Sequence, residues 1–179
     1  MAESLTYEKI LELFAETDRQ FKETDRKFKE TDKKIGEIAG TLGRFVEGLV
    51  EPKLLELFKK RGINLTEILH NIEIYRNGQK DTEIDLLLIN SDYSIAVEIK
   101  TTLTVEGVNE HLKRLDKLKN NPPKYIKGTI LIGAVAGMRI EEKSDKYAYR
   151  QGLFVLKQKG ELVEIANDDK FKPREWGIR

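Results

Sequence analysis

The chain has 179 residues, of which 39% are hydrophobic and 35% are charged. This length suits one domain of the usual size, roughly 100 to 150 residues, with an appendage of some tens of residues. Cysteine is absent, which excludes disulfides, thiolate metal sites and a cysteine nucleophile, and two histidines nearly exclude a multi-histidine zinc site. The formal charge is only +1, so attraction to nucleic acid requires a local basic patch.

The amino-terminal part of the chain is repetitive. Residues 14–34 consist of three near-identical heptads, FAETDRQ, FKETDRK and FKETDKK. Phenylalanine at position a and threonine at position d indicate a helix whose narrow apolar stripe needs a partner. We therefore predict that residues 1–42 form a coiled-coil oligomerisation helix, which makes the protein a homodimer or higher oligomer of open strand number and orientation. The alternative is a helix that packs on its own domain or stays solvated.

A cluster of glycines follows the heptads, at Gly36, Gly40, Gly43 and Gly48. Because glycine weakens helices, the cluster predicts a loosened joint and a domain boundary near Gly40 to Gly43. The second predicted domain is 43–179.

This second domain alternates between helical and strand patterns. Apolar residues at helical spacing predict a helix over 44–61. Runs rich in β-branched residues predict strands over 71–76, 82–90 and 94–102, and the turn formers between them predict consecutive antiparallel hairpins.

The remaining pattern continues the alternation. It predicts an amphipathic helix over 105–119, a strand covered on both faces over 129–136 and a helix over 139–152. A final hairpin is expected around Lys159 and Gly160. This order predicts an α/β fold with helices on the faces of a sheet.

Three charged residues lie among apolar strand residues: Asp85 in the second predicted strand, and Glu98 and Lys100 in the third. Alternation along a strand puts Glu98 and Lys100 on one face, where Asp85 can oppose them across a hairpin. Such charges are costly unless they are paired or hold an ion. Two converging carboxylates favour a divalent cation, with Lys100 handling the attacking water, which indicates hydrolysis of a phosphodiester. The alternative is a satisfied salt-bridge network.

These residues resemble the PD-(D/E)XK nuclease superfamily, through Asp85 in EIDLLL and the Glu-x-Lys of VEIKT, in the helix, three-strand, helix, strand order of that fold. The similarity covers approximately residues 44–136 and extends to Holliday-junction resolvases and RecB-like nuclease domains. The resemblance implies a restriction-endonuclease-like mixed sheet flanked by helices. It also implies Mg²⁺ or Mn²⁺ held by Asp85 and Glu98, with a further glutamate from the first core helix, either Glu51, which we prefer, or Glu47.

The helix predicted over 105–119 carries basic residues just after this strand. Lys113, Arg114 and Lys117 are candidates for contact with nucleic-acid phosphates, and the alternative is a solvated helix face. On the same helix, we expect His111 to be a surface histidine.

Aromatic residues near the carboxy terminus have structural roles in this interpretation. Trp176 packs the basic tail onto its own domain, with stacking on unpaired bases as the alternative. Tyr147 and Tyr149 pack rather than catalyse.

The combined patterns predict a cytoplasmic, homo-oligomeric, metal-dependent endonuclease acting on DNA, without membrane association because long apolar runs are absent. A dimer brings two sites to one duplex, which suits double-stranded or branched DNA. The alternative is a catalytically inactive oligomeric module that binds nucleic acid or protein.

Overall fold

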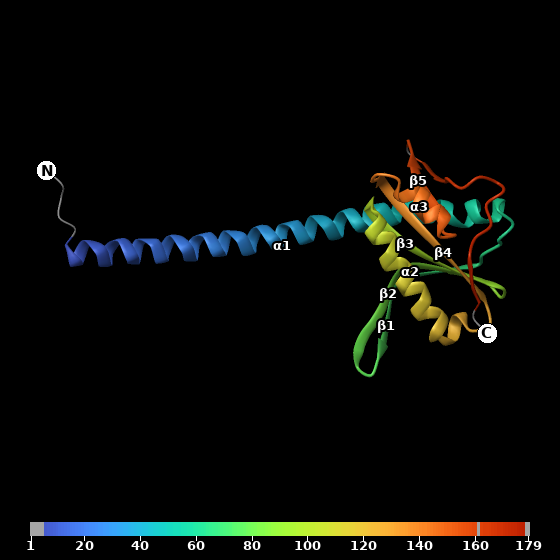
Figure 1. Ribbon diagram of the computed structural model, residues 1–179, viewed down its shortest axis with the longest axis horizontal. Coiled ribbons are helices and arrows are strands. Elements are labelled where there is room, and N and C mark those ends of the chain that lie inside the picture. Colours follow the sequence, from blue (N-terminus) through green and yellow to red (C-terminus); the bar gives the residue numbers. More distant parts are fainter. Residues whose placement is uncertain (1–5, 161, 178–179) are drawn as a thin grey trace. The chain divides into compact units, whose positions relative to one another are not determined.

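Figure 1 shows the computed structural model, which describes residues 6–160 and 162–177; the side chains of residues 34–52 lie outside the described part. The chain forms two units, Met1–Leu42 and Gly43–Arg179. Helix α1 (Tyr7–Lys60) begins in the first unit and ends in the second.

The heptad segment of α1 is helical, as predicted, and its charged residues pair along the helix surface. Aspartate or glutamate four residues before lysine is the favourable order, but solvent screens such exposed pairs and each contributes little. The ion pairs are Asp18–Lys22 at 2.7 Å, Glu23–Lys27 at 2.8 Å and Asp25–Lys29 at 2.8 Å. These contributions are small, so the segment depends on association or packing for stability.

The backbone is helical throughout the glycine cluster. Gly36, Gly40, Gly43 and Gly48 all lie within the continuous helix α1. Glycine costs a helix about 1 kcal/mol relative to alanine but does not block helical dihedral angles. Because no two of these glycines are adjacent, helical hydrogen bonding continues through them.

The second unit is built on one mixed sheet. Its strands occur in the order β1-β2-β3-β4-β5-β6, and β7 pairs with β4 beside β5. The strands are β1 (Glu67–Arg76), β2 (Gln79–Ile89), β3 (Tyr93–Leu103), β4 (Ile130–Ile140), β5 (Phe154–Lys159), β6 (Leu162–Ile165) and β7 (Glu175–Gly177). The first three strands form the predicted antiparallel hairpins, whereas β4 runs parallel to β3 and to β5.

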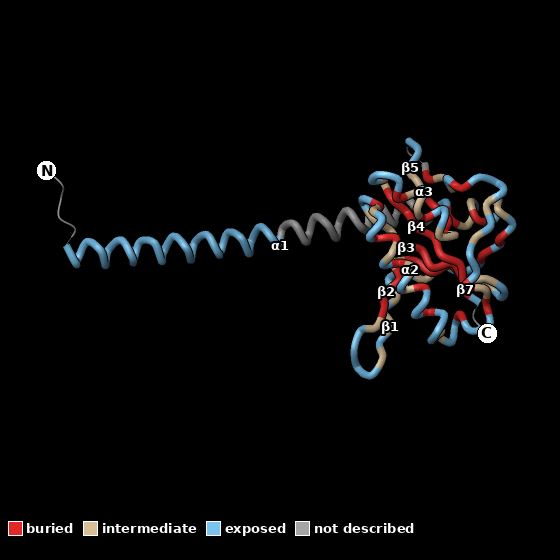
Figure 2. Tube along the Cα trace, in the orientation of Figure 1, coloured by how far each residue is buried: buried red, intermediate tan, exposed pale blue. Residues whose placement is uncertain are grey.

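Helices cover both faces of this sheet. Leu54 and Phe58, near the end of α1, are fully buried on one face, and Phe58 meets the Phe154 ring edge-on at 5.3 Å. Helix α2 (Val105–Asn120) covers the other face through its buried leucines. Figure 2 shows that the buried residues are concentrated in β3 and β4 between these layers. The predicted α/β class, a mixed sheet flanked by helices with a long amino-terminal helix, is confirmed.

Close packing of α2 on β4 requires glycine at one position. A Cβ atom on Gly133 would lie 2.4 Å from Leu115 Cδ1 and 2.5 Å from Leu153 Cδ2. Neighbouring β4 residues are buried on both faces, as predicted for this strand. The glycine therefore allows α2 to lie close to the sheet.

The helix predicted over 139–152 is shorter than expected. Strand β4 extends to Ile140 because Arg139 and Ile140 continue the parallel pairing with the end of β3. A short helix, α3 (Ser144–Arg150), follows. The final hairpin of β5 and β6 is present as predicted.

Trp176 anchors the carboxy-terminal tail, as predicted. Its side chain is 1% exposed, and its ring Nε1 donates a hydrogen bond to Asp116 Oδ1 at 2.9 Å. The Arg174 guanidinium lies over the ring, 4.4 Å from its centre. The tail thus closes against α2 and the edge of β4 that β5 leaves unpaired.

Candidate functional site

Strands β2 and β3 separate at the candidate site. Their pairing ends at Leu86 and Val97, so the next positions along the two strands are Asp85 and Glu98. The Asp85 carboxylate takes the place of a backbone acceptor there, because the Ile99 amide donates to Asp85 Oδ2 at 2.7 Å. This bond holds the aspartate beside the segment of β3 that carries Glu98 and Lys100.

Glu98 is the centre of a charged cluster. Its side chain is almost fully buried, and both of its carboxylate oxygens have cationic partners. Lys100 Nζ lies 2.7 Å from Oε1, and Arg114 Nη1 from α2 donates to Oε2. Lys100 and Arg114 are 36% and 27% exposed, so the cluster reaches solvent through its cations.

His111 lies beneath this cluster, which contradicts its expected position at the surface. The residue is 1% exposed and its Nε2 lies 3.1 Å from the Ala96 carbonyl oxygen. Its Nδ1 is 3.9 Å from Glu98 Oε2 and has no hydrogen-bond partner. The charge pattern of α2 suggested a solvated face there, but His111 is on the turn that meets β3.

The surroundings separate the protonation behaviour of the two carboxyl groups. Burial, followed by the nearby charge of Glu98, raises the pKa of Asp85 to about 6, against the hydrogen bond from Ile99. Burial also opposes ionisation of Glu98, but the hydrogen bond from Lys100 and the surrounding cations outweigh it and lower the pKa of Glu98. Glu98 is therefore ionised near neutral pH, and Asp85 loses its proton only as the pH rises through about 6.

His111 is a neutral member of the cluster. Burial lowers its pKa to about 4, although the nearby Glu98 carboxylate acts in the opposite direction. A neutral imidazole at pH 7 adds no positive charge, so Lys100 and Arg114 compensate the charge of Glu98 at that pH.

The carboxylates offer the oxygen ligands that a hard divalent cation prefers. Asp85 uses Oδ2 for the Ile99 amide, and its pKa is raised partly by repulsion from Glu98, which a cation would relieve. A cation that binds through Glu98 meets the positive charges of Arg114 and Lys100 on its two oxygens. Within the part of the chain that the structure describes, no group of three or more acidic or histidine side chains is arranged to hold a metal ion. A metal at this position would be held by Asp85 and Glu98, with water or substrate oxygens completing its coordination.

The proposed third carboxylates are outside the described side chains. Glu47 and Glu51 both lie in the stretch 34–52 of α1. The structure therefore does not describe whether either glutamate approaches Asp85 or Glu98.

A cleft of about 380 Å³ lies beside the carboxylate cluster, between β2 and α2. The predicted phosphate-contacting residues Lys113, Arg114 and Lys117 all line it. Lys117 Nζ lies 3.1 Å from Asp81 Oδ1 across the cleft, and Arg114 connects the cleft to Glu98. Its complete lining is Lys80, Asp81, Thr82, Glu83, Glu110, Lys113, Arg114 and Lys117.

The β2 side of the cleft has a buried hydroxyl and an ion pair at its rim. Thr82 is 6% exposed, and its buried hydroxyl Oγ1 has no hydrogen-bond partner. Lys80 bonds Glu83 at 2.6 Å and Glu73 at 2.7 Å, so Glu83 forms an ion pair at the rim of the cleft.

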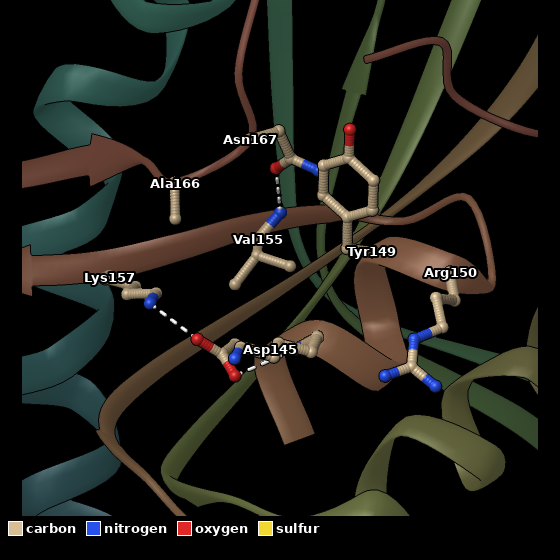
Figure 3. A pocket seen from close by; sticks show the side chains of 8 residues that line it. Asp145, Tyr149, Arg150, Val155, Lys157, Ala166 and Asn167 are labelled. Atoms are coloured by element: carbon tan, nitrogen blue, oxygen red, sulfur yellow. Dashed lines mark hydrogen bonds and ion pairs between the residues drawn. The ribbon is translucent and has the colours of Figure 1, made fainter. Parts of the chain in front are cut away.

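A second cleft of about 380 Å³ lies between α3 and β5, away from the predicted site residues (Figure 3). Lys157 Nζ bonds Asp145 Oδ2 at 2.7 Å, and Asn167 Oδ1 accepts a hydrogen bond from the Val155 amide. Tyr149 lines the same cleft, but its hydroxyl bonds Asp168 at 2.7 Å. These side chains therefore have structural partners, and Tyr149 packs as predicted.

The chain is distantly similar to a known structure. No family model and no curated protein sequence matches the chain. The crystal structure of a repair endonuclease from Pyrococcus abyssi is similar at 15% sequence identity and a TM-score of 0.41, over 61% of this chain and 45% of that chain. This chain therefore spans less than half of that protein.

Among the described helices of this chain, none is long and apolar enough to cross a membrane.

Proposed function

We propose that the second unit is a metal-dependent endonuclease domain that hydrolyses phosphodiester bonds in DNA, of the PD-(D/E)XK type. The observation that carries this proposal is the convergence of Asp85, Glu98 and Lys100 where β2 and β3 separate. The antiparallel order of β1 to β3, followed by α2 and the parallel strand β4, is the order that the resemblance implies. The cleft beside the cluster, which is lined by four cationic and three acidic side chains, provides an approach for a phosphate backbone.

Asp85 and Glu98 would hold Mg²⁺ or Mn²⁺, with Glu51 or Glu47 as a further ligand. The bound cation supplies Lewis acidity and lowers the pKa of a water molecule. Lys100, which is bonded to Glu98 and partly exposed, would orient the attacking water and stabilise negative charge on the phosphate.

One side of the cleft carries the cationic groups that a polyanion would contact. Lys113, Arg114 and Lys117 lie there together with Glu110, and backbone phosphates account for most of the affinity of proteins for DNA.

We also propose that the heptad segment joins copies of this chain. Phe14, Phe21 and Phe28 are about two-thirds or more exposed along one stripe. Between them, the hydroxyls of Thr17 and Thr24 bond carbonyl oxygens of the preceding helical turn at 2.7 and 2.8 Å. With its hydroxyl satisfied, each threonine adds a methyl group to the stripe, which gives the seam the apolar character of a coiled coil.

Sedimentation tests this association. Phe21→Glu puts a charge into the seam and is expected to reduce the oligomer to monomers. Lys22→Glu is the control, because Lys22 lies outside the seam, where it pairs with Asp18. A wild-type chain that sediments as a monomer at micromolar concentration would contradict the proposal.

A second candidate function is supported by a specific observation. Both oxygens of Glu98 are already bonded to cations, as expected for a satisfied salt-bridge network. An oligomeric module that binds nucleic acid or protein without cleaving it would need no metal at this position.

Supercoiled plasmid separates the two candidates. We expect Mg²⁺- or Mn²⁺-dependent nicking that is lost in Asp85→Asn and in Lys100→Met. Lys119→Gln removes a positive charge from α2 outside the cleft and serves as the matched control. Plasmid that is bound but never cut, with any of these cations, would support the binding module instead.

A further inference from the structure

Arg114 connects two parts of the second unit that the proposed function treats separately. Its guanidinium donates to Glu98 Oε2 in the carboxylate cluster, and its side chain also lines the cleft between β2 and α2. We propose that Arg114 is a gate: it covers Glu98 until a nucleic-acid phosphate enters the cleft, and the phosphate then draws Arg114 away and opens Glu98 to a divalent cation. This inference rests on the proposed function, because it assumes that Asp85 and Glu98 bind a metal.

The bonds of Glu98 show why the site is closed without substrate. Both carboxylate oxygens face cationic donors, one from Lys100 and the other from Arg114. The side chain of Glu98 is only 2% exposed. A divalent ion that binds Glu98 meets the positive charges of both partners as it approaches, and displacing one of them frees a carboxylate oxygen.

Arg114 is the partner that can be displaced by substrate. Lys100 lies two residues from Glu98 on the same strand and does not line the cleft. Arg114 comes from α2 with Lys113 just before it in the sequence, and both line the cleft where phosphates would lie. A guanidinium bonds phosphate and carboxylate in the same forked geometry, so a phosphate in the cleft competes directly with Glu98 for Arg114.

The gate makes the two ligands cooperative. If a nucleic acid raises the affinity for the metal by a given factor, the metal must raise the affinity for the nucleic acid by the same factor. The physical source of this coupling is the hydrogen-bonded ion pair between Arg114 and Glu98. Whichever ligand binds first supplies the free energy that breaks this pair, so the second ligand does not have to supply it again. The consequence is that the site binds its metal more tightly when substrate is present.

The test measures Mn²⁺ affinity by calorimetry, in the cold, with and without a saturating blunt-ended DNA duplex whose integrity is checked afterwards. For the full-length wild-type chain, we expect the duplex to tighten Mn²⁺ binding by about tenfold or more, which corresponds to the energy of one charge-assisted hydrogen bond. In Arg114→Gln, Mn²⁺ alone should bind about tenfold tighter than in the wild type, and the effect of the duplex should fall below about threefold. Arg114→Met, which keeps the aliphatic stem, provides the same test if circular dichroism shows that the glutamine variant is unfolded.

Lys113→Gln is the matched control, because it removes one positive charge from the same cleft without a bond to Glu98. It should weaken duplex binding and leave the affinity for Mn²⁺ alone within about twofold of the wild-type value. If Arg114→Gln binds Mn²⁺ no tighter than Lys113→Gln, the gate is wrong, even in a protein that cuts plasmid. If the wild type binds no Mn²⁺ with or without duplex and cuts no plasmid, the proposed function fails and the gate fails with it.

Discussion

Replacing Asp85 with asparagine should stabilise the protein at neutral pH. The pKa of Asp85 is about 6 in the folded protein against an ordinary value of 3.8, because burial and Glu98 disfavour its charge. A difference of about 2 units at 1.36 kcal/mol each gives an upper limit of about 3 kcal/mol, which solvent contact and rearrangement of the cations reduce to about 1 to 3 kcal/mol. Asparagine removes this cost and keeps an oxygen that can accept the Ile99 amide.

The pH dependence has a definite sign. Between about pH 4 and pH 6 the folded protein binds more protons at Asp85 than the unfolded chain does, so this residue lowers stability as the pH rises through that range. The advantage of Asp85→Asn should therefore be near zero at the acid end and complete above about pH 6. Urea unfolding of both proteins at several pH values measures it, because the difference cancels the titrating groups that do not interact with Asp85.

Asp85→Ala is the control for the hydrogen bond. It also removes the charge, but it leaves the Ile99 amide without its acceptor, which costs about 1 to 3 kcal/mol. We expect the alanine variant to be less stable than the asparagine variant at every pH. An asparagine variant less stable than the wild type at pH 7.5 would refute the conclusion that Asp85 is held in its charged form at a cost to folding.

Three further substitutions test other parts of the structure. The pKa of His111 is about 4, so this residue binds fewer protons in the folded protein than in the unfolded chain. The wild type should therefore lose stability, at most about 3 kcal/mol, as the pH falls from about 6.5 to 4, and His111→Gln should remove this loss. Urea unfolding at both ends of this range measures it, and an unchanged pH slope would contradict the burial of the imidazole. Trp176→Ala should destabilise the protein by about 3 to 5 kcal/mol by leaving a cavity under the tail, and a shift of the urea midpoint worth less than about 1 kcal/mol would contradict the anchoring role. Gly133→Ala should cost about 1 to 3 kcal/mol in the same assay, since its Cβ would overlap Leu115 and Leu153, and a neutral effect would mean that α2 can move away from β4 at no cost.

Local sequence patterns predicted the elements that are formed by residues close together in the sequence. The heptads identified the helical segment, and alternating β-branched runs identified the β1 to β3 hairpins. Asp85, Glu98 and Lys100 could also be identified from the sequence, because charges among apolar strand residues are unusual and the hairpin of β2 and β3 brings them together.

Long-range pairing could not be predicted in the same way. The end of β4 near Arg139 read as helix, and its strand conformation comes from pairing with β3, far away in the sequence. The contact of Arg114 with Glu98 and the burial of His111 depend on how α2 is rotated over the sheet. A helical pattern defines which residues share a face, but it does not fix which of them meets a given strand.

The third metal ligand stays a prediction for a different reason. The resemblance to PD-(D/E)XK nucleases implied Glu51 or Glu47 from the first core helix, and both lie in the stretch whose side chains the structure does not describe. Mn²⁺ affinities of Glu51→Gln and Glu47→Gln, compared with the wild type, would distinguish them.

Anomalous scattering from crystals grown with Mn²⁺ and a DNA duplex tests the central claim most directly, because it locates the metal without relying on activity. The account predicts a manganese peak roughly 2.1 Å from oxygens of both Asp85 and Glu98, with the Arg114 guanidinium moved from Glu98 to a phosphate. A duplex bound in the cleft with no manganese between these carboxylates, and with Arg114 still bonded to Glu98, would contradict it.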